Sequence, residues 1–388
     1  MPQVRYHFEP DGRFVIEDYN HAQPFFSFLP GIAGRTGIPI WAFYTNRGQA
    51  MAGFGYQDKD GAIQEYVPAD KAPWYAAWRG FRTFIKLKSP SGTILYEPFR
   101  PGPEHPARNK LIVSAAELEL IEIRPDLELE VAVTYFTLPG ARLGGLYRRT
   151  TIANRGAGPI RLEILDGLAA MLPAGFEDRL AKHMGATIRA WMQVELVAGA
   201  PFHRLGYRPD DVPELYPVAG GHFHFGYTVE NGLVKGLRPL YDPEAVFGPG
   251  PDYRPMRFAA ADFRYPREQP RENYLPAAFS HLERELPAGG SMEIFGLFGR
   301  APDEESLGSF LPEIGAGHFE ERRQANRALI GGIADLAFTS SAQPLFDRYL
   351  GQCCLDNAVR GGIPIALTGR ERPKIFWLYS RKHGDLER

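Results

Sequence analysis

The sequence predicts a mainly β protein, a large antiparallel β-sandwich followed by helices. Runs of alternating apolar and polar residues recur between residues 13 and 300, separated by turn residues. The composition agrees, because 42 Gly and 34 Pro supply turns, while 26 Phe and 18 Tyr suit strands of a packed sandwich. The alternation stops near Pro302, where a helical pattern begins. At 388 residues, the chain is long enough for more than one domain.

The clearest β-hairpin joins two long alternating runs, 117–123 and 127–136, across the turn 124–126. The next two runs, 147–154 and 160–165, flank the turn 155–158, and we expect them to pair in the same way. Other runs that predict strands are 13–17, 40–44, 81–88, 93–96, 190–197, 222–229 and 292–298. The segment 239–276 contains eight prolines and is predicted to be a long loop region.

Helices are predicted after residue 301. Acidic residues at 303–305 suit the start of a helix, and 318–337 has helical periodicity. A further helix is expected after Ser341, with Pro344 in its first turn and Gly361 at its end. We therefore divide the chain into a sandwich domain (1–300), a helical linker (301–340) and a C-terminal part (341–388).

Charge and composition exclude several partners. The net charge is −2 and the pI is about 6.6, so electrostatic attraction to nucleic acid or to an anionic membrane is not expected. The sequence has no run of 18 apolar residues and no signal-peptide pattern at its start. Cys353 and Cys354 are adjacent in a predicted helix, where a disulfide between them would be strained. A reduced, cytoplasmic protein is the simpler interpretation.

Two candidate sites lie in the predicted sheets, and each has an alternative interpretation. His222 and His224 fall on one face of a strand, as two metal ligands could, but no third ligand is identifiable, so a polar sheet face is favoured and no metal is expected. Trp41 and Tyr44, with amide residues nearby, could stack and bind a sugar. Core packing explains these two aromatic residues at least as well.

The most site-like cluster is at the end of the sequence, where Arg381, His383, Asp385 and Glu387 follow an apolar run. A solvated charge run is the alternative interpretation. We predict that these four residues contribute to substrate binding, together with Trp41 and Tyr44.

Several blocks of sequence resemble the amino-terminal region of cellobiose-phosphorylase-type inverting glycoside phosphorylases. They include FVIEDYN at 14–20, FSFLPGIAG at 26–34, GIPIWAFYTNRGQ at 37–49 and GFRTFI at 80–85. Further blocks are YEPF at 96–99, DN at 356–357, RGG at 360–362 and SRKHGDLER at 380–388. The branch that acts on β-1,3-gluco-oligosaccharides is the most similar.

The resemblance implies a fold and a reaction. The fold is a β-supersandwich of the galactose-mutarotase type, then a helical linker and an (α/α)6 barrel. The reaction is reversible phosphorolysis, in which a carboxylic acid protonates the glycosidic oxygen while phosphate attacks the anomeric carbon. The implied partners are a β-gluco-oligosaccharide and inorganic phosphate, with no cofactor. A homodimer through the sandwich is the assembly that the resemblance favours.

The catalytic residues of such enzymes lie in the barrel, so the resemblance assigns no catalytic residue here. Twelve barrel helices need about 140 residues, whereas 48 follow residue 340. We therefore expect an amino-terminal fragment that ends at the truncated start of the barrel and is inactive alone. The alternative is a non-catalytic carbohydrate-binding or assembly module. A mutarotase-like epimerase would need a His/Glu pair, of which His222 or His224 could supply half.

Overall fold

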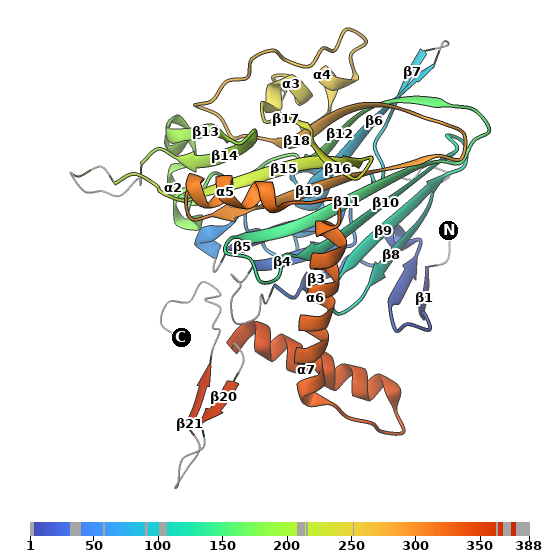
Figure 1. Cartoon of the computed structure of the whole chain (residues 1–388), viewed down its shortest axis with the longest axis vertical. Helices are drawn as coiled ribbons and strands as arrows, with labels where there is room; N and C mark the ends of the chain where they lie inside the picture. The colour runs from blue at the N-terminus through green and yellow to red at the C-terminus, as the bar shows by residue number, and fades with distance from the viewer. Residues whose placement is uncertain are drawn as a thin grey trace.

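Two antiparallel β-sheets face each other in the computed structural model, with helices on the outside (Figure 1). The structure describes residues 4–31, 40–56, 59–89, 92–100, 107–207, 214, 216–250, 252–361, 364–367 and 374–377. The sequence prediction of a mainly β antiparallel sandwich followed by helices is confirmed.

The larger sheet has eleven strands within the described residues. Its order is β1 (Arg5–Phe8), β2 (Phe14–Glu17), β8 (Arg108–Val113), β9 (Leu118–Arg124), β10 (Leu129–Thr137), β11 (Gly144–Asn154), β19 (Ser291–Ala301), β15 (Gly221–Glu230), β14 (Ala200–Leu205) and β13 (Met192–Val197), with β16 (Leu233–Gly236) paired to β15.

The smaller sheet has the order β17 (Arg238–Leu240), β18 (Ala278–Leu286), β12 (Ile160–Leu168), β6 (Phe81–Ser89) and β7 (Gly92–Tyr96). A third sheet contains β3 (Phe26–Leu29), β4 (Ile40–Thr45) and β5 (Met51–Tyr56). Alternation along each strand places one set of apolar side chains between the two large sheets, such as Val131 and Val133 of β10 and Ile164 of β12.

Helices and loops cover the two outer faces of the sandwich. The α-helices are α1 (Ala72–Arg79), α2 (Asp178–Ile188), α3 (Pro243–Phe247), α4 (Met256–Ala259), α5 (Glu304–Phe310), α6 (His318–Ala334) and α7 (Pro344–Gly361), and short 3₁₀ helices are 19–21, 59–61, 189–191, 311–313 and 335–337. The start of α6 packs through Phe319 on the larger sheet, while α3 and α4 pack through Phe247 and Phe258 on the smaller sheet. After α7 follows a hairpin of β20 (Pro364–Leu367) and β21 (Lys374–Trp377).

The structure confirms one predicted hairpin and corrects another. β9 and β10 pair across the turn, with Arg124 opposite Leu129. The predicted pairing of 147–154 with 160–165 is wrong, because β11 belongs to the larger sheet and β12 to the smaller one. Asn154 holds this crossover, since its amide donates to the carbonyls of Gly158 and Pro287. The alternation of a strand sets its buried face but not its partner.

The helices predicted after residue 301 are present as α5, α6 and α7. Helix α7 covers the predicted span, and the Oγ of Ser341 accepts a hydrogen bond from the backbone N–H of Gln343 just before it. Strand β19 ends at Ala301 and helix α5 begins at Glu304. None of the helices in the described part of the chain is both long and apolar enough to cross a membrane.

A buried ion pair joins the two large sheets. Arg148 of β11 is fully buried, and its Nη2 donates to Oδ1 of Asp166 of β12 at 2.6 Å, while its Nε donates to Oδ2 at 3.2 Å. The hydroxyl groups of Thr83 and Thr150 also donate to Asp166, at 2.6 and 3.1 Å. Burial lowers the pKa of Arg148, but the charge of Asp166 outweighs it and leaves this pKa raised. Arg148 therefore stays charged inside the core, in contact with Asp166.

Replacement of Asp166 by Asn should destabilise the protein strongly. It would leave the Arg148 guanidinium buried without a counter-charge, which typically costs about 3–5 kcal/mol. Chemical denaturation of wild type and Asp166→Asn would measure this loss.

The matched control is Arg161→Gln. Arg161 is on β12, as Asp166 is, and its substitution removes an exposed ion pair with Glu285 of β18. Exposed pairs contribute up to about 1 kcal/mol. An equal effect of the two substitutions would contradict a special role for the buried pair.

Candidate functional site

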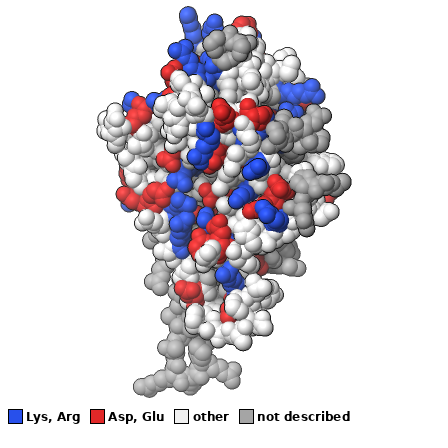
Figure 2. All heavy atoms as spheres, turned by 90° about the vertical axis from the view of Figure 1, so that its right-hand side faces the viewer, with Lys and Arg blue, Asp and Glu red and all other residues white. Residues whose placement is uncertain are grey.

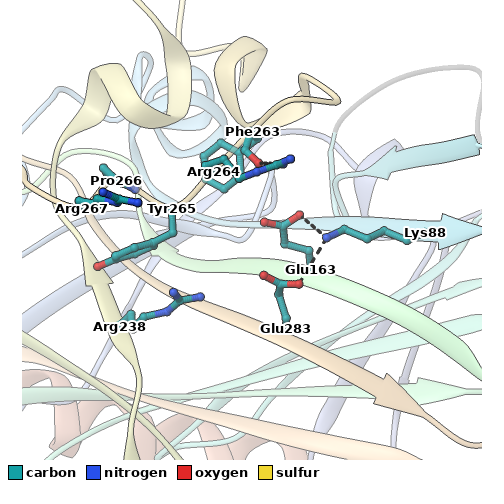
Figure 3. A pocket seen from close by; sticks show the side chains of 9 residues that line it. All are labelled: Lys88, Glu163, Arg238, Phe263, Arg264, Tyr265, Pro266, Arg267 and Glu283. Carbon is teal, nitrogen blue, oxygen red and sulfur yellow. Dashed lines mark hydrogen bonds and ion pairs between the residues drawn. The ribbon is translucent and has the colours of Figure 1, made fainter.

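A charged pocket of about 840 Å³ lies on the outer face of the smaller sheet. Figure 3 shows that its side chains come from the sheet on one side and from the loop before β18 on the other. Lys88 is on β6, Glu163 on β12 and Glu283 on β18. The lining residues are Lys88, Glu163, Arg238, Phe263, Arg264, Tyr265, Pro266, Arg267 and Glu283.

The strand register brings the sheet residues of the pocket together. Glu163 lies directly opposite Glu283 on β18 and opposite Lys86 on β6. His281 and Lys88 lie two residues further along these strands, so all five side chains share one face. Residues that are 195 positions apart in sequence, Lys88 and Glu283, thereby come within 3.4 Å.

Hydrogen bonds and aromatic packing fix the loop over the sheet. The Gln269 side chain accepts from the backbone N–H of Tyr241 and Asp242 and donates to the carbonyl of Pro239. The Tyr265 hydroxyl donates to the same Pro239 carbonyl at 2.7 Å. Phe263 is buried in the cluster between loop and sheet, so the neighbouring residues 264–267 are held at the pocket.

Glu163 at the floor of the pocket is held as a carboxylate. Burial would raise its pKa, but hydrogen bonds from His281 and Lys88 and the charge of Lys86 lower it to about 2. His281 Nε2 lies 3.1 Å from Glu163 Oε1, and Lys88 Nζ lies 2.9 Å from Oε2. Because Arg238 Nη2 donates to His281 Nδ1 at 2.7 Å, the proton of His281 is on Nε2 and points to Glu163.

Glu163, His281 and Glu283 also bring potential metal-ligand atoms within 4.8 Å of one another. However, the Lys88 ammonium lies 2.9 Å from the Glu163 carboxylate and 3.4 Å from that of Glu283. A positive charge therefore already stands between the two carboxylates. This arrangement suits an internal ion-pair network better than a metal ion.

A second candidate surface is the exposed aromatic face of α1. Trp74 and Trp78 are 73% and 62% exposed, and they are one helical turn apart. Ala72 and Ala76 on the opposite face of α1 are buried against Ala52 of β5. At 1.5 Å per residue, the two indoles are displaced by about 6 Å along the helix. We call Trp74 and Trp78 the indole pair.

Beside α1 lies a cavity of about 530 Å³ whose lining includes Glu65, Arg79 and Tyr253. Arg79 Nη1 donates to Glu65 Oε2 at 3.2 Å and lies 5.2 Å from the centre of the Tyr253 ring. Arg82 Nη1 donates to the carbonyls of Trp78 and Tyr253, which ties α1 to the loop. Charged and phenolic groups that can bind sugar hydroxyls thus line a cavity beside α1, the helix that carries the indole pair.

The loop between α1 and β6 explains why α1 ends where it does. A Cβ atom on Gly80 would approach the carbonyl oxygens of Ala76 and Met51 to 2.5 Å. Glycine is therefore needed for α1 to turn directly into β6.

The structure places the two predicted sugar-binding aromatic residues in the interior. Trp41 is 5% exposed and packs edge-on against Phe43, and Tyr44 is 3% exposed. Burial raises the pKa of Tyr44. A sugar-binding role for Trp41 and Tyr44 stays a prediction.

The sequence analysis missed the indole pair. The spacing of four residues between the two tryptophans, opposite two alanines, could have revealed it.

The other predicted binding residues, Arg381, His383, Asp385 and Glu387, lie outside the described residues. The residues of the charged pocket were also missed, since they come from strands and a loop whose pairing the sequence does not show.

His222 and His224 are buried on β15 and face His203 of β14. His224 Nδ1 lies 3.4 Å from His203 Nε2, and His222 Nδ1 contacts the Leu172 carbonyl at 2.5 Å. Burial lowers the pKa of His222 and of His224 to about 3 and that of His203 also strongly. These imidazoles are therefore neutral members of a polar sheet face, the favoured interpretation of the sequence.

Comparisons with known proteins identify no family. No protein-family model matches the chain, and no curated protein sequence matches it. Among solved structures, a polysaccharide lyase gives a TM-score of 0.41 at 10% sequence identity. The match covers 69% of this chain and 33% of the lyase chain. A protein described as a putative kojibiose phosphorylase from the human microbiome gives a TM-score of 0.38 at 6% sequence identity. The match covers 86% of this chain and 39% of the chain of that protein.

A galactose mutarotase-like protein from Clostridium acetobutylicum gives a TM-score of 0.34 at 9% identity, covering 77% of this chain and 98% of its own. This chain thus spans between a third and two fifths of the length of the first two proteins. At TM-scores this low, the likeness defines neither a family nor an activity.

The buried histidines predict that stability falls as the pH is lowered. The pKa of His222 and His224 is about 3 in the folded protein, against 6.5 when solvated, and that of His318 is about 4. Below pH 6.5 the unfolded chain therefore binds more protons, and each histidine removes up to about 1.4 kcal/mol per pH unit. Denaturation between pH 7 and 5 should show this loss, above the range in which carboxylates protonate.

The double substitution His222→Gln/His224→Gln should reduce the slope of stability against pH by about half. It removes two of the four buried histidines with a lowered pKa in the described part of the chain. His21→Gln, at an exposed histidine, is the control and should keep the wild-type slope. A wild-type slope in the double variant would show that His222 and His224 do not titrate on unfolding.

Proposed function

We propose that this chain is a carbohydrate-binding β-sandwich, the amino-terminal part of an inverting glycoside phosphorylase, which binds β-gluco-oligosaccharides and does not cleave them by itself. The observation that carries the proposal is the indole pair of α1, Trp74 and Trp78. The sequence blocks between residues 14 and 99 support the enzyme class.

Exposed tryptophans with a fixed spacing favour a sugar ligand. Each indole offers a flat apolar face and one N–H donor, a combination that matches the apolar C–H face and hydroxyl groups of a pyranose ring. Exposed apolar surface of this kind in a folded protein typically marks a binding site. Glu65 and Arg79, which line the cavity beside α1, supply polar groups that can orient a sugar.

The state of the carboxyl groups supports binding rather than cleavage. Protonation of a glycosidic oxygen needs a carboxyl group whose pKa is raised towards neutral pH. In the described part of the chain, a carboxyl pKa is raised by burial at Glu122 and Asp242, and by a hydrogen bond with Glu195 at Glu304. Glu122 binds Tyr96 in the core, Asp242 caps α3, and Glu304 pairs with Arg204, so each of the three already has a structural partner.

The His/Glu pair of the charged pocket does not favour an epimerase. His281 and Glu163 are in hydrogen-bond contact, but their side chains are only 1% and 6% exposed. Glu163 has a pKa of about 2 and is therefore a weak base. This pair fits a structural role at the pocket floor.

Trp74→Ala/Trp78→Ala should strongly weaken oligosaccharide binding. Titration of the wild-type protein with laminari- and cello-oligosaccharides should give a saturable change in tryptophan fluorescence, because the indoles lose contact with water when a sugar stacks on them. Aromatic stacking of this kind contributes about 1 kcal/mol or more per ring, so removal of both indoles should weaken binding at least tenfold.

The matched control is Trp191→Phe, at a tryptophan that is 37% exposed and lies outside α1. This variant should bind as wild type does. Sedimentation of the double variant would show whether the indole pair instead joins two copies of the chain. A change in oligomeric state without any saturable sugar binding would contradict the proposal.

The isolated chain should release no sugar 1-phosphate from β-gluco-oligosaccharides and inorganic phosphate. The reason is that Glu163, the carboxylate of the charged pocket, cannot donate a proton near neutral pH. A phosphate-dependent assay of sugar 1-phosphate checks this expectation. Measurable release would contradict it, and Glu163→Gln would then show whether Glu163 is the proton donor.

A further inference from the structure

The charged pocket carries an excess of positive charge. Its lining contains four cationic side chains and only two carboxylates, Glu163 and Glu283. The whole chain, in contrast, has a net charge of −2, and acidic and basic side chains are interleaved over the face shown in Figure 2. The pocket is therefore a local concentration of positive charge on a protein that is slightly acidic overall.

The two carboxylates are already paired with lysines. Glu163 lies 2.9 Å from Lys88 and 3.6 Å from the buried Lys86, and Glu283 lies 3.4 Å from Lys88. Lys86 is also held by the Phe258 ring, 4.4 Å from its Nζ. The lysines thus neutralise the acids of the pocket floor and leave the arginines without counter-charges.

The three arginines of the pocket form no ion pair with a carboxylate of the described residues. Arg238 donates to His281 at 2.7 Å and lies 4.4 Å from the centre of the Tyr265 ring. Arg264 donates to the backbone carbonyl of Phe263. Figure 3 shows Arg238 and Arg267 on opposite sides of the Tyr265 ring. These arginines therefore keep a positive charge that no carboxylate of the described residues neutralises, and an anion from solution can bind them.

We propose that this pocket binds an oxyanion, a phosphate or carboxylate group, either free or carried by a sugar. Guanidinium groups present parallel N–H donors that match the oxygens of both anions. Arg238 covers one face of the Tyr265 ring, and a sugar attached to the anion would stack on the other face. This site is separate from the indole pair and goes beyond the proposed function.

Hydrogen bonds at the floor position one of the arginines in advance. Glu163 accepts from His281 Nε2, and His281 Nδ1 accepts from Arg238, so the three side chains form one chain of hydrogen bonds. The Tyr265 ring lies 5.3 Å from the His281 ring. It also lies against the Arg238 guanidinium, 4.4 Å away, and restrains it. A guanidinium held in this way loses little side-chain entropy when it binds an anion.

Isothermal titration with inorganic phosphate, glucose 6-phosphate, glucuronate and glucose tests the proposal. The anions should bind saturably and more weakly as salt is raised, whereas glucose should give no heat at this site. Tighter binding of glucose 6-phosphate than of phosphate, lost in Tyr265→Ala, would show that the sugar is recognised. Equal affinities would show that the oxyanion alone is recognised.

Arg238→Met/Arg267→Met should weaken anion binding at least tenfold, because each charged hydrogen bond contributes about 1.5–3 kcal/mol. Arg161→Gln is the matched control, since it removes an exposed arginine of the same sheet that is paired with Glu285. It should leave the affinity unchanged. An equal loss of anion affinity in both variants would mean that anions are attracted by the overall charge of the surface. That result would overturn the proposed site.

Glu283→Gln gives a test that does not depend on loss of folding. Removal of this exposed carboxylate should strengthen anion binding severalfold, because it removes a repulsive charge from the pocket. Unchanged affinity, or no saturable anion binding in the wild type, would overturn the proposal. Neutral oligosaccharides report separately on the indole pair, so failure of one site is distinguishable from failure of the other.

Discussion

The ion pair between Arg148 and Asp166 is the interaction on which the rest of the sandwich depends. It lies between the two large sheets, where a charge without a partner would be costly. Each polar group is satisfied: Arg148 also donates to Tyr135 and Thr83, and Thr83 accepts from Gln49. These partners come from both sheets and from the turn of the third sheet, so the network fixes how the sheets lie on each other.

The same strands that build this network also build the charged pocket. On β6, Thr83 points inward to the ion pair, while Lys86 and Lys88 point outward. On β12, Asp166 points inward and Glu163 outward. The period of two along a strand thus links the core to the site. Helix α1 joins β6 through Gly80, so the indole pair is attached to the same strand.

Sequence patterns predicted the strands and the late helices because alternation and helical periodicity are local. The pairing of β11 with β12 was predicted wrongly because two alternating runs joined by a short turn can lie in different sheets. The site was harder to predict. Lys88, Glu163 and Glu283 meet only through strand register, which no local pattern records. Trp41 was predicted to bind sugar because it is aromatic. It differs from Trp74 in its exposure to solvent, and that exposure depends on the complete fold.

A double-mutant cycle on Arg148 and Asp166 tests the central claim most directly. Arg148→Met, Asp166→Asn and the combined variant would be unfolded in denaturant under the same conditions. If the pair joins the sheets as described, the double variant should lose much less stability than the sum of the two single variants, with a coupling energy of about 2–3 kcal/mol. Additive losses, with a coupling energy near zero, would contradict this account of the fold.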